Sequence, residues 1–303
     1  MVIRIPTFDH QKMVLSVIMV LALCLTAIAS ADDHGIGFEL ASPPPESSAM
    51  SLAATTTDLT MRPSILRLPN CRRITADQLQ TLDLTVFCFS TPGGEPIPNC
   101  DIRITHRVIP FSGGHDHDDA NRPKGTFTPD SGNTGTSGLL AVKYTAPEVS
   151  GIIEWTLTGV PQGGGRGATL ISTIGVRIDG LEALPPAPPP EENYDLIGET
   201  SRHADNHYGT PGFNAALVDL ANRYAKEFPA QKLSYNDISL VEGGLFDIGP
   251  ESNWNPPHCG HRFGTHVDLR LVPVANRKRL RDLIKESGIR TIVDEGNHWH
   301  LQQ

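Results

Sequence analysis

A proline-rich run, Pro185-Pro186-Ala187-Pro188-Pro189-Pro190, constrains the folding of this chain more than any other feature. Proline fixes its own φ angle and lacks a backbone N–H, so neither a helix interior nor a central strand passes through such a run. The run favours an extended, semi-rigid spacer. We therefore predict a linker over residues 181–193, and two domains suit a chain of 303 residues.

The region before this linker has the pattern of short antiparallel strands. Leu82, Leu84, Val86 and Cys88 occupy every second position, and the same alternation recurs over residues 102–105. A period of two indicates half-buried strands. Further strands, separated by turn-forming residues, are expected over residues 139–144, 152–159 and 169–178. This spacing predicts an all-β sandwich over residues 61–180.

The N-terminus has the pattern of a secretory signal peptide over residues 1–31. Arg4 and Lys12 flank the start of an apolar run, and small residues follow it. A retained membrane anchor is the alternative, but the run is short for a span of roughly 20 residues. We expect a secreted or periplasmic cell-envelope protein with no membrane span after cleavage. Residues 32–60, rich in Ala, Ser, Thr and Pro, are expected to be a flexible lead-in.

Cysteine content and net charge narrow the compartment and the partners. Cleavage would leave Cys71, Cys88, Cys100 and Cys259, an even number that is compatible with disulfides in an exported protein. The first three lie in one β-rich region, so at most one bridge forms among them, and the pairing stays open. The formal net charge of −9 argues against nucleic acid as a partner, because binding phosphates needs a basic surface.

The region after the linker, residues 194–303, mixes helical and strand patterns. Thr210 and Pro211 suit the N-cap and first turn of a helix that ends near Phe228. A second helix and two strands are expected over residues 275–287, 267–272 and 289–293. The sequence therefore predicts an α+β domain at this end of the chain.

Two histidine-rich motifs in this domain have the composition of a metal site. The first includes His261 and Asp268, and the second is the pair His298 and His300. Imidazole nitrogen and carboxylate oxygen are ligands that Zn²⁺ accepts, and three protein ligands leave a fourth position for water. The motifs predict a metal-dependent hydrolase with Zn²⁺ as its cofactor. Histidines packed in a polar core or lying on the surface are the alternative interpretation.

A third histidine-rich segment, His115-Asp116-His117-Asp118-Asp119, lies between predicted strands of the sandwich. Its imidazole and carboxylate groups suit a divalent cation. A mobile polar loop tip explains the same composition, and we favour that interpretation. Because the segment belongs to the other predicted domain, we do not join it to the zinc motifs.

The sandwich region resembles bacterial immunoglobulin-like repeats. The resemblance rests on the turn and strand pattern from Gly125-Thr-Phe-Thr-Pro to Gly138 and on Tyr144-Thr-Ala-Pro-Glu-Val-Ser-Gly151. It implies a spacer or binding module of an exported protein, with no chemistry of its own.

The C-terminal motifs, His261-x-x-Gly264-x-x-x-Asp268 and the terminal His298-x-His300, resemble those of the LAS metallopeptidases. This family includes D-Ala-D-Ala dipeptidases, D,D-carboxypeptidases and penicillin-insensitive murein endopeptidases, and the Hedgehog signalling domain shares its fold. The resemblance covers residues 194–303. It implies a Hedgehog-like zinc domain in which His261, Asp268 and His300 hold Zn²⁺ and His298 assists catalysis.

Some details of this resemblance stay open. His258 is similar to a residue of the murein endopeptidases, but Cys259 replaces a serine that many relatives carry two positions before the first ligand. Glu295-x-x-His298 also matches the form used by the dipeptidases. In that assignment, His298 is the third metal ligand and Glu295 is the catalytic base. We expect His258, Arg202 and His207 to lie near the substrate.

The resemblance implies an exported zinc peptidase that hydrolyses peptidoglycan stem peptides or related D-amino-acid peptides, with peptidoglycan or muropeptides as its partners. Two alternatives belong to other classes. The first is a non-catalytic zinc-containing module for binding or adhesion at the cell envelope. The second is an adhesin or spacer in which the sandwich binds the ligand. An enzyme needs both the metal and the His298 or Glu295 base, whereas a binding module tolerates loss of the base.

Overall fold

The computed structural model describes residues 49–54, 59–60, 81–91, 95–117, 121–189, 192–247, 254 and 259–303. Residues Ser47–Gln303 belong to one compact unit. The predicted signal peptide, Cys71 and His258 lie outside the described residues. No helix among the described residues is long and apolar enough to cross a membrane.

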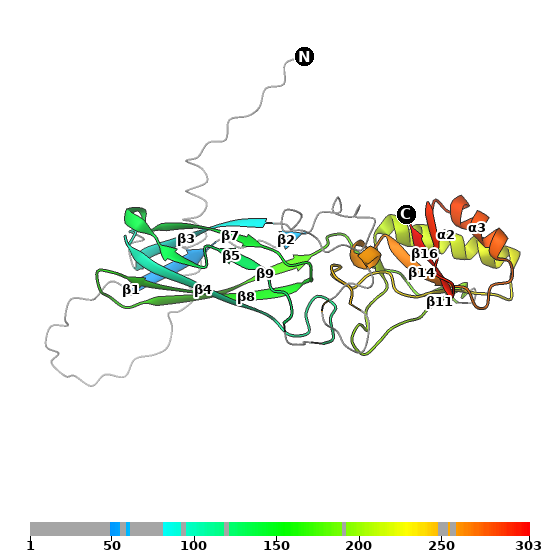
Figure 1. The fold of residues 1–303 in the computed structure, drawn as a ribbon, viewed down its shortest axis with the longest axis horizontal. Coiled ribbons are helices and arrows are strands. Elements are labelled where there is room, and N and C mark those ends of the chain that lie inside the picture. Colours follow the sequence, from blue (N-terminus) through cyan, green and yellow to red (C-terminus); the bar gives the residue numbers. More distant parts are fainter. Residues whose placement is uncertain are drawn as a thin grey trace, which may run out of the picture. The chain divides into compact units, whose positions relative to one another are not determined.

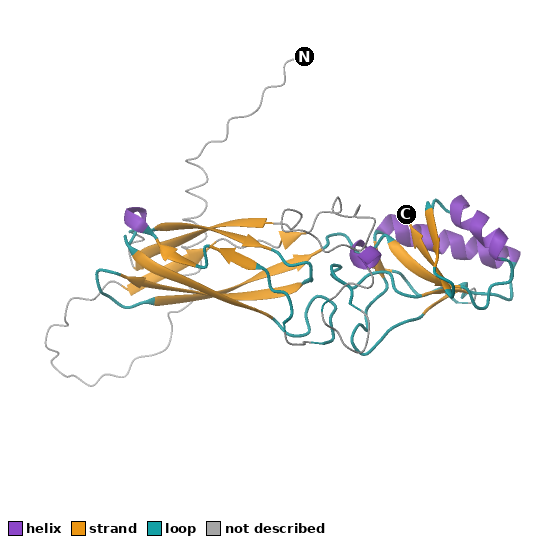
Figure 2. Ribbon diagram, viewed as in Figure 1, coloured by secondary structure: helices purple, strands orange, loops and turns teal. Residues whose placement is uncertain are grey.

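The N-terminal half of this unit is a sandwich of two β-sheets (Figures 1 and 2). The first sheet has the order β1 (Ala49–Ala54), β3 (Thr81–Thr91), β7 (Leu139–Thr145) and β5 (Thr126–Thr128). The second has the order β2 (Leu59–Thr60), β9 (Ala168–Arg177), β8 (Gly151–Pro161), β4 (Cys100–Val108) and β6 (Ser131–Asn133). A 3₁₀ turn, η3, covers Gly135–Ser137. The sandwich predicted from period-two alternation is confirmed.

The two sheets share one buried core. Alternate residues of β3 and β4, among them Val86 and Ile102, pack into it with the fully buried ring of Trp155 from β8. A disulfide between Cys88 and Cys100 joins β3 to β4 and therefore connects the two sheets. The structure thus supplies the single bridge that the sequence allowed within this region.

The C-terminal part is built on a five-stranded sheet. Its order is β11 (Tyr194–Leu196), β13 (Leu233–Tyr235), β14 (His266–Arg270), β16 (His298–Gln302) and β15 (Thr291–Asp294). Two helices, α2 (Pro211–Glu227) and α3 (Arg277–Glu286), accompany the sheet, and a 3₁₀ turn, η4, covers Cys259–Phe263. Helix α2 begins where the sequence predicted, because the Thr210 side chain accepts a hydrogen bond from the backbone N–H of Phe213.

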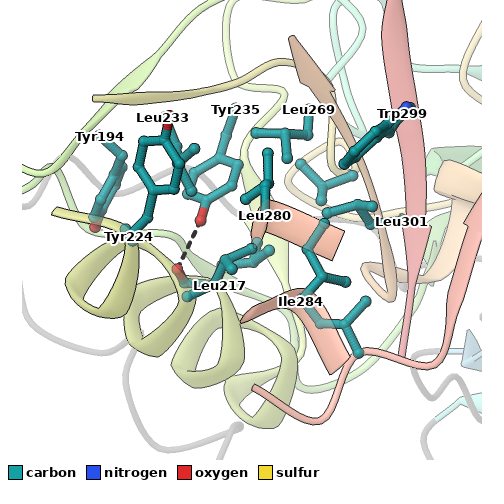
Figure 3. Packing of buried hydrophobic residues seen from close by; sticks show 14 of the residues in the cluster. Tyr194, Leu217, Tyr224, Leu233, Tyr235, Leu269, Leu280, Ile284, Trp299 and Leu301 are labelled. Atoms are coloured by element: carbon teal, nitrogen blue, oxygen red, sulfur yellow. Dashed lines mark hydrogen bonds between the residues drawn. The ribbon is translucent and has the colours of Figure 1, made fainter. Parts of the chain in front are cut away.

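The helices pack on one face of this sheet through a common hydrophobic cluster (Figure 3). Leu217 and Tyr224 of α2 and Leu280 of α3 contribute to it, together with Leu269 and Trp299 from the sheet. The hydroxyl of Tyr235 donates to the carbonyl of Leu217 at 2.7 Å, which satisfies a polar group inside the cluster. This packing leaves the opposite face of β14 and β16 available for polar side chains.

Two segments expected to be free of structure contribute to the fold. The predicted lead-in, residues 32–60, supplies β1, which pairs with β3. The predicted linker, residues 181–193, supplies β10 (Glu182–Ala183), which pairs with β12 (Tyr208–Gly209), and Leu184 is buried in the C-terminal cluster. Part of each segment is therefore held by pairing and burial.

Candidate metal centre

Strand pairing places the predicted zinc ligands side by side. In the antiparallel ladder of β14 and β16, Asp268 is opposite His300 and Arg270 is opposite His298. Opposed residues project from the same face of a sheet, and so do residues two apart on one strand. All four side chains therefore belong to one face, away from the helices.

The third predicted zinc ligand, His261, lies in η4, and a turn that contains a glycine connects it to β14. Gly264 in this turn has φ +66°. A Cβ atom there would lie 2.6 Å from Leu181 Cδ2 and 2.8 Å from Gly209 Cα. Glycine is thus required both by the backbone angle and by the close approach of these neighbours. The tight turn lets His261 lie against the strand that carries Asp268.

The structure brings His261, Asp268 and His300 together, and we call these three residues the His261 cluster. Their ligand atoms all lie within 4.8 Å of one another. Asp268 Oδ1 is 3.4 Å from His261 Nε2 and 2.9 Å from His300 Nδ1. His261 Nδ1 donates to the carbonyl of Ile238 at 2.9 Å, so Nε2 is the nitrogen directed at the cluster. Two imidazoles and a carboxylate in this arrangement are a suitable donor set for Zn²⁺.

The carboxylate of this cluster stays ionised. Burial raises the pKa of Asp268, but hydrogen bonds and charges from His261 and His300 outweigh burial, so its pKa lies below the ordinary value. His266, which packs against His300, has a pKa lowered to about 3, mainly by burial and next by the charge of His300. The ionised carboxylate is the form of Asp268 that can bind a metal ion.

His298 lies beside the cluster and next to Glu295. Its Nε2 atom is 3.4 Å from Asp268 Oδ2 and 3.1 Å from Glu295 Oε2. Its Nδ1 atom donates to the side-chain oxygen of Asn297 at 2.6 Å. In the neutral ring Nε2 therefore carries the lone pair, which can accept a proton or bind a metal. Among the described residues, the group that could hold a metal contains His300 and not His298, which is the first of the two ligand assignments that the sequence left open.

A cavity of about 590 Å³ adjoins these residues. Asp268, Arg270 and His298 line one part of it, and the loop of residues 198–203 lines another. Asp237, a further lining residue, was missed by the sequence prediction. Burial raises the pKa of Asp237 to about 6, and Asn206 and Asn236 donate to its two oxygens. Its place two residues after β13, next to the polar residue Asn236, is the signal that could have identified it.

The predicted substrate-binding residues lie in different places. Arg202 lines the cavity, and its guanidinium contacts His117 Nδ1 at 3.0 Å. His207 is buried, and its Nε2 atom lies 2.9 Å from the carbonyl of Ile197. Burial lowers the pKa of His207. His207 is not among the residues that line the cavity, so its predicted role in substrate binding finds no support in this arrangement.

A second group, which we call the His115 cluster, contains His115, His117, His203 and Asp247. Their exposed fractions are 0%, 7%, 3% and 1% respectively. The prediction of a mobile polar loop tip is therefore wrong, because residues of the C-terminal part cover both histidines. Burial lowers the pKa of His115 to about 2. Burial raises the pKa of Asp247, but hydrogen bonds from His117 and His203 outweigh it and bring the pKa below its ordinary value.

Comparisons with known proteins address only part of the chain. No family model matches this chain, and no curated protein matches its sequence. The ASH/PapD-like domain of human CEP192 is similar at 15% identity and a TM-score of 0.30, over 48% of this chain and 97% of that domain. The class 5 fimbriae chaperone CfaA is similar at 10% identity and a TM-score of 0.29, over 45% of this chain and 59% of that protein.

The adhesin InvE of Yersinia pseudotuberculosis is a further structural neighbour, at 16% identity and a TM-score of 0.28. The similarity covers 44% of this chain and 34% of the adhesin. Likeness at this level carries no argument about activity. The assignment of a β-sandwich rests instead on the strand order and shared core of the two sheets.

Proposed function

We propose that this protein is an exported zinc-dependent peptidase that hydrolyses peptide bonds in peptidoglycan stem peptides or related D-amino-acid peptides. The observation that carries this proposal is the His261 cluster, a three-donor group beside a cavity that Asp268 and His298 line. Four donors buried on all sides would favour a structural ion, whereas three donors beside a cavity leave room for chemistry.

The donor set fits zinc without help from other residues. His261 and His300 offer imidazole nitrogen, and Asp268 offers an ionised carboxylate oxygen. The side chain of His300 is 18% exposed, so this end of the cluster is open to a small molecule. A zinc ion held by these side chains would supply Lewis acidity, which activates water and polarises a carbonyl group.

The neighbouring residues would manage the proton. His298 Nε2 accepts a proton in the proposed reaction, and Glu295, 3.1 Å away, stabilises the imidazolium that results. Asn297 holds the other ring nitrogen and fixes the orientation of the imidazole. If His298 is instead a metal ligand, Glu295 takes the proton directly. Both assignments use the same two side chains.

The cavity offers charge complementarity to a stem peptide. Arg202 and Arg270 line it and can bind a peptide carboxylate, and Glu199 can bind an amine. The Cys88–Cys100 disulfide supports export, because such bridges persist in oxidising compartments outside the cytosol. Peptidoglycan as the substrate rests on the resemblance of the C-terminal motifs to the LAS metallopeptidases.

Mass spectrometry of muropeptides tests this proposal. The zinc-loaded protein should generate fragments whose masses identify the bond cut, and the His300→Gln variant should generate none. His106→Gln is the matched control, because His106 contacts Gly125 within the sandwich and belongs to neither cluster. Intact muropeptides in a sample with bound zinc would contradict the peptidase proposal and favour a zinc-containing binding module.

A further inference from the structure

The His115 cluster brings three imidazoles and one carboxylate together from three separate loops. His115 and His117 follow β4, His203 lies between β11 and β12, and Asp247 follows β13. We propose that these four side chains bind a second zinc ion, which has a structural role and ties the sandwich loop to the C-terminal loops. This inference does not depend on the proposed peptidase activity.

The distances within the cluster fit a tetrahedral site. Asp247 Oδ1 is 3.3 Å from His203 Nε2, 3.4 Å from His117 Nε2 and 3.7 Å from His115 Nδ1. The Nε2 atoms of His117 and His203 are 3.2 Å apart. Ligands about 2.0–2.1 Å from a tetrahedral zinc ion are separated by about 3.3 Å. These four separations of 3.2–3.7 Å are close to this value, and all four ligand atoms lie within 4.8 Å of one another.

Hydrogen bonds among the described residues do not account for the burial of His115. Its side chain is completely buried, yet among the described residues neither of its ring nitrogens has a hydrogen-bond partner. A buried polar group that lacks such a partner is destabilising. The Nδ1 atom faces Asp247, whose carboxylate the other two histidines also approach. A metal ion between them would satisfy Nδ1 and explain why three imidazoles converge on one carboxylate.

Two aromatic rings pack against the three histidines of the cluster. The ring of Trp254 stacks on His117 with centroids 4.8 Å apart and contacts His115 edge-on at 5.1 Å. Phe246 packs edge-on against His203 at 5.0 Å. Apolar rings around a site exclude water and hold the ligands in place. These rings also favour a closed site with four protein ligands, which is the arrangement of structural zinc.

The donor types select the class of metal. Three nitrogens and one oxygen are unsuitable for Ca²⁺ or Mg²⁺, which take oxygen ligands in larger numbers. Zn²⁺ accepts this mixture and prefers the tetrahedral arrangement that the distances describe.

The contact between Arg202 and His117 is part of the metal-free arrangement. The guanidinium donates to His117 Nδ1 at 3.0 Å, which places the ring proton on Nε2, the atom that faces Asp247. Zinc binding at Nε2 would leave the ring proton on Nδ1, and Arg202, which can only donate, would turn away from the ring. Because His203 lines the cavity, an ion in the His115 cluster would also fix this part of the cavity wall.

Zinc content of the purified full chain tests the inference. After saturation with Zn²⁺ and removal of excess, the wild-type protein should hold about two ions per chain, and the His115→Gln and Asp247→Asn variants about one. His106→Gln should match the wild type. Equal zinc content in the wild type and in both cluster variants would overturn the proposal. Circular dichroism would establish that each variant is folded.

Cobalt gives a second readout in which the His115 cluster is intact. In the His261→Gln variant, Co²⁺ should produce the strong visible absorption of a tetrahedral site, because the four donors of the His115 cluster remain. Adding Asp247→Asn should remove that absorption. A folded His261→Gln protein that lacks a tetrahedral cobalt spectrum would overturn the proposal independently of any change to the cluster itself.

Discussion

The His115 cluster and the His261 cluster contain the same types of donor group, and we propose different roles for them. The His115 cluster has four donors, all buried, and aromatic rings pack against it. The His261 cluster has three donors, lies beside a cavity, and includes a partly exposed histidine. In our two proposals, donor number and solvent access, rather than residue type, separate a structural metal site from a catalytic one.

The largest expected difference between the two clusters is in the rate of muropeptide hydrolysis when a ligand of each is replaced. His261→Gln should reduce muropeptide hydrolysis to background, because it removes a ligand of the proposed reactive ion. His115→Gln should keep hydrolysis within about tenfold of the wild type, because the affected cluster only supports the cavity wall. Initial rates at matched zinc saturation provide the measurement. Equal loss in two folded variants would mean that the clusters share one role.

A smaller effect should come from the residues beside the His261 cluster. His298→Gln should lower kcat by about 10²–10⁴-fold if its imidazole acts as the base. Zinc content should then stay at the wild-type level, whereas loss of an ion would identify His298 as a ligand. Glu295→Gln, measured in parallel, should give the larger loss in that second case. Steady-state kinetics with metal analysis would therefore decide whether His298 is the base or a metal ligand.

Thermal stability should respond mainly to the His115 cluster. Zinc at about 1,000 times its Kd would stabilise the folded chain by about 4 kcal/mol, equivalent to a rise in Tm on the order of 10 °C. Asp247→Asn should abolish most of this rise, and His106→Gln should not change it. Calorimetry with and without zinc measures both. A full zinc-dependent rise in Asp247→Asn would assign the stabilisation to the other cluster.

The smallest effect should come from the disulfide, which lies in the sandwich away from both donor sets. Replacing Cys88 and Cys100 together by alanine should lower the free energy of unfolding by about 3 kcal/mol. Zinc content should not change, because neither cysteine belongs to a cluster. Denaturant unfolding with metal analysis checks both points. Loss of zinc from this folded variant would show that the clusters depend on the sandwich as a whole.

The sequence predicted the elements whose causes are local. Period-two alternation identified β3 and β4, and Thr210 followed by Pro211 located the start of α2. Two short motifs carry the residues of the His261 cluster, and the resemblance to the LAS metallopeptidases implied which three of them are ligands. Local patterns gave a wrong prediction where tertiary contacts determine the structure. Leu184, within the predicted linker, is buried because the C-terminal cluster provides a place for it.

The His115 cluster could be recognised only in part. His115 and His117 lie in a segment dense in imidazole and carboxylate groups, which suits a cation site, although the sequence alone favoured a polar loop tip. His117 and His203 are 86 residues apart in sequence, and no periodicity connects them. Asp247 likewise follows a different strand, without a motif of its own. Burial that depends on three distant loops is a property of the folded chain, which a local pattern does not report.

The position of Trp254 gives the protein an optical signal of its own. Its indole ring stacks directly on His117. A paramagnetic ion such as Co²⁺ or Cu²⁺ at the His115 cluster should therefore quench the fluorescence of this tryptophan through close contact. Replacing it by phenylalanine would remove that component of the emission and keep an aromatic ring over the imidazole. Metal occupancy of the His115 cluster could thus be followed in solution without any added dye, during an assay of the activity proposed for the His261 cluster.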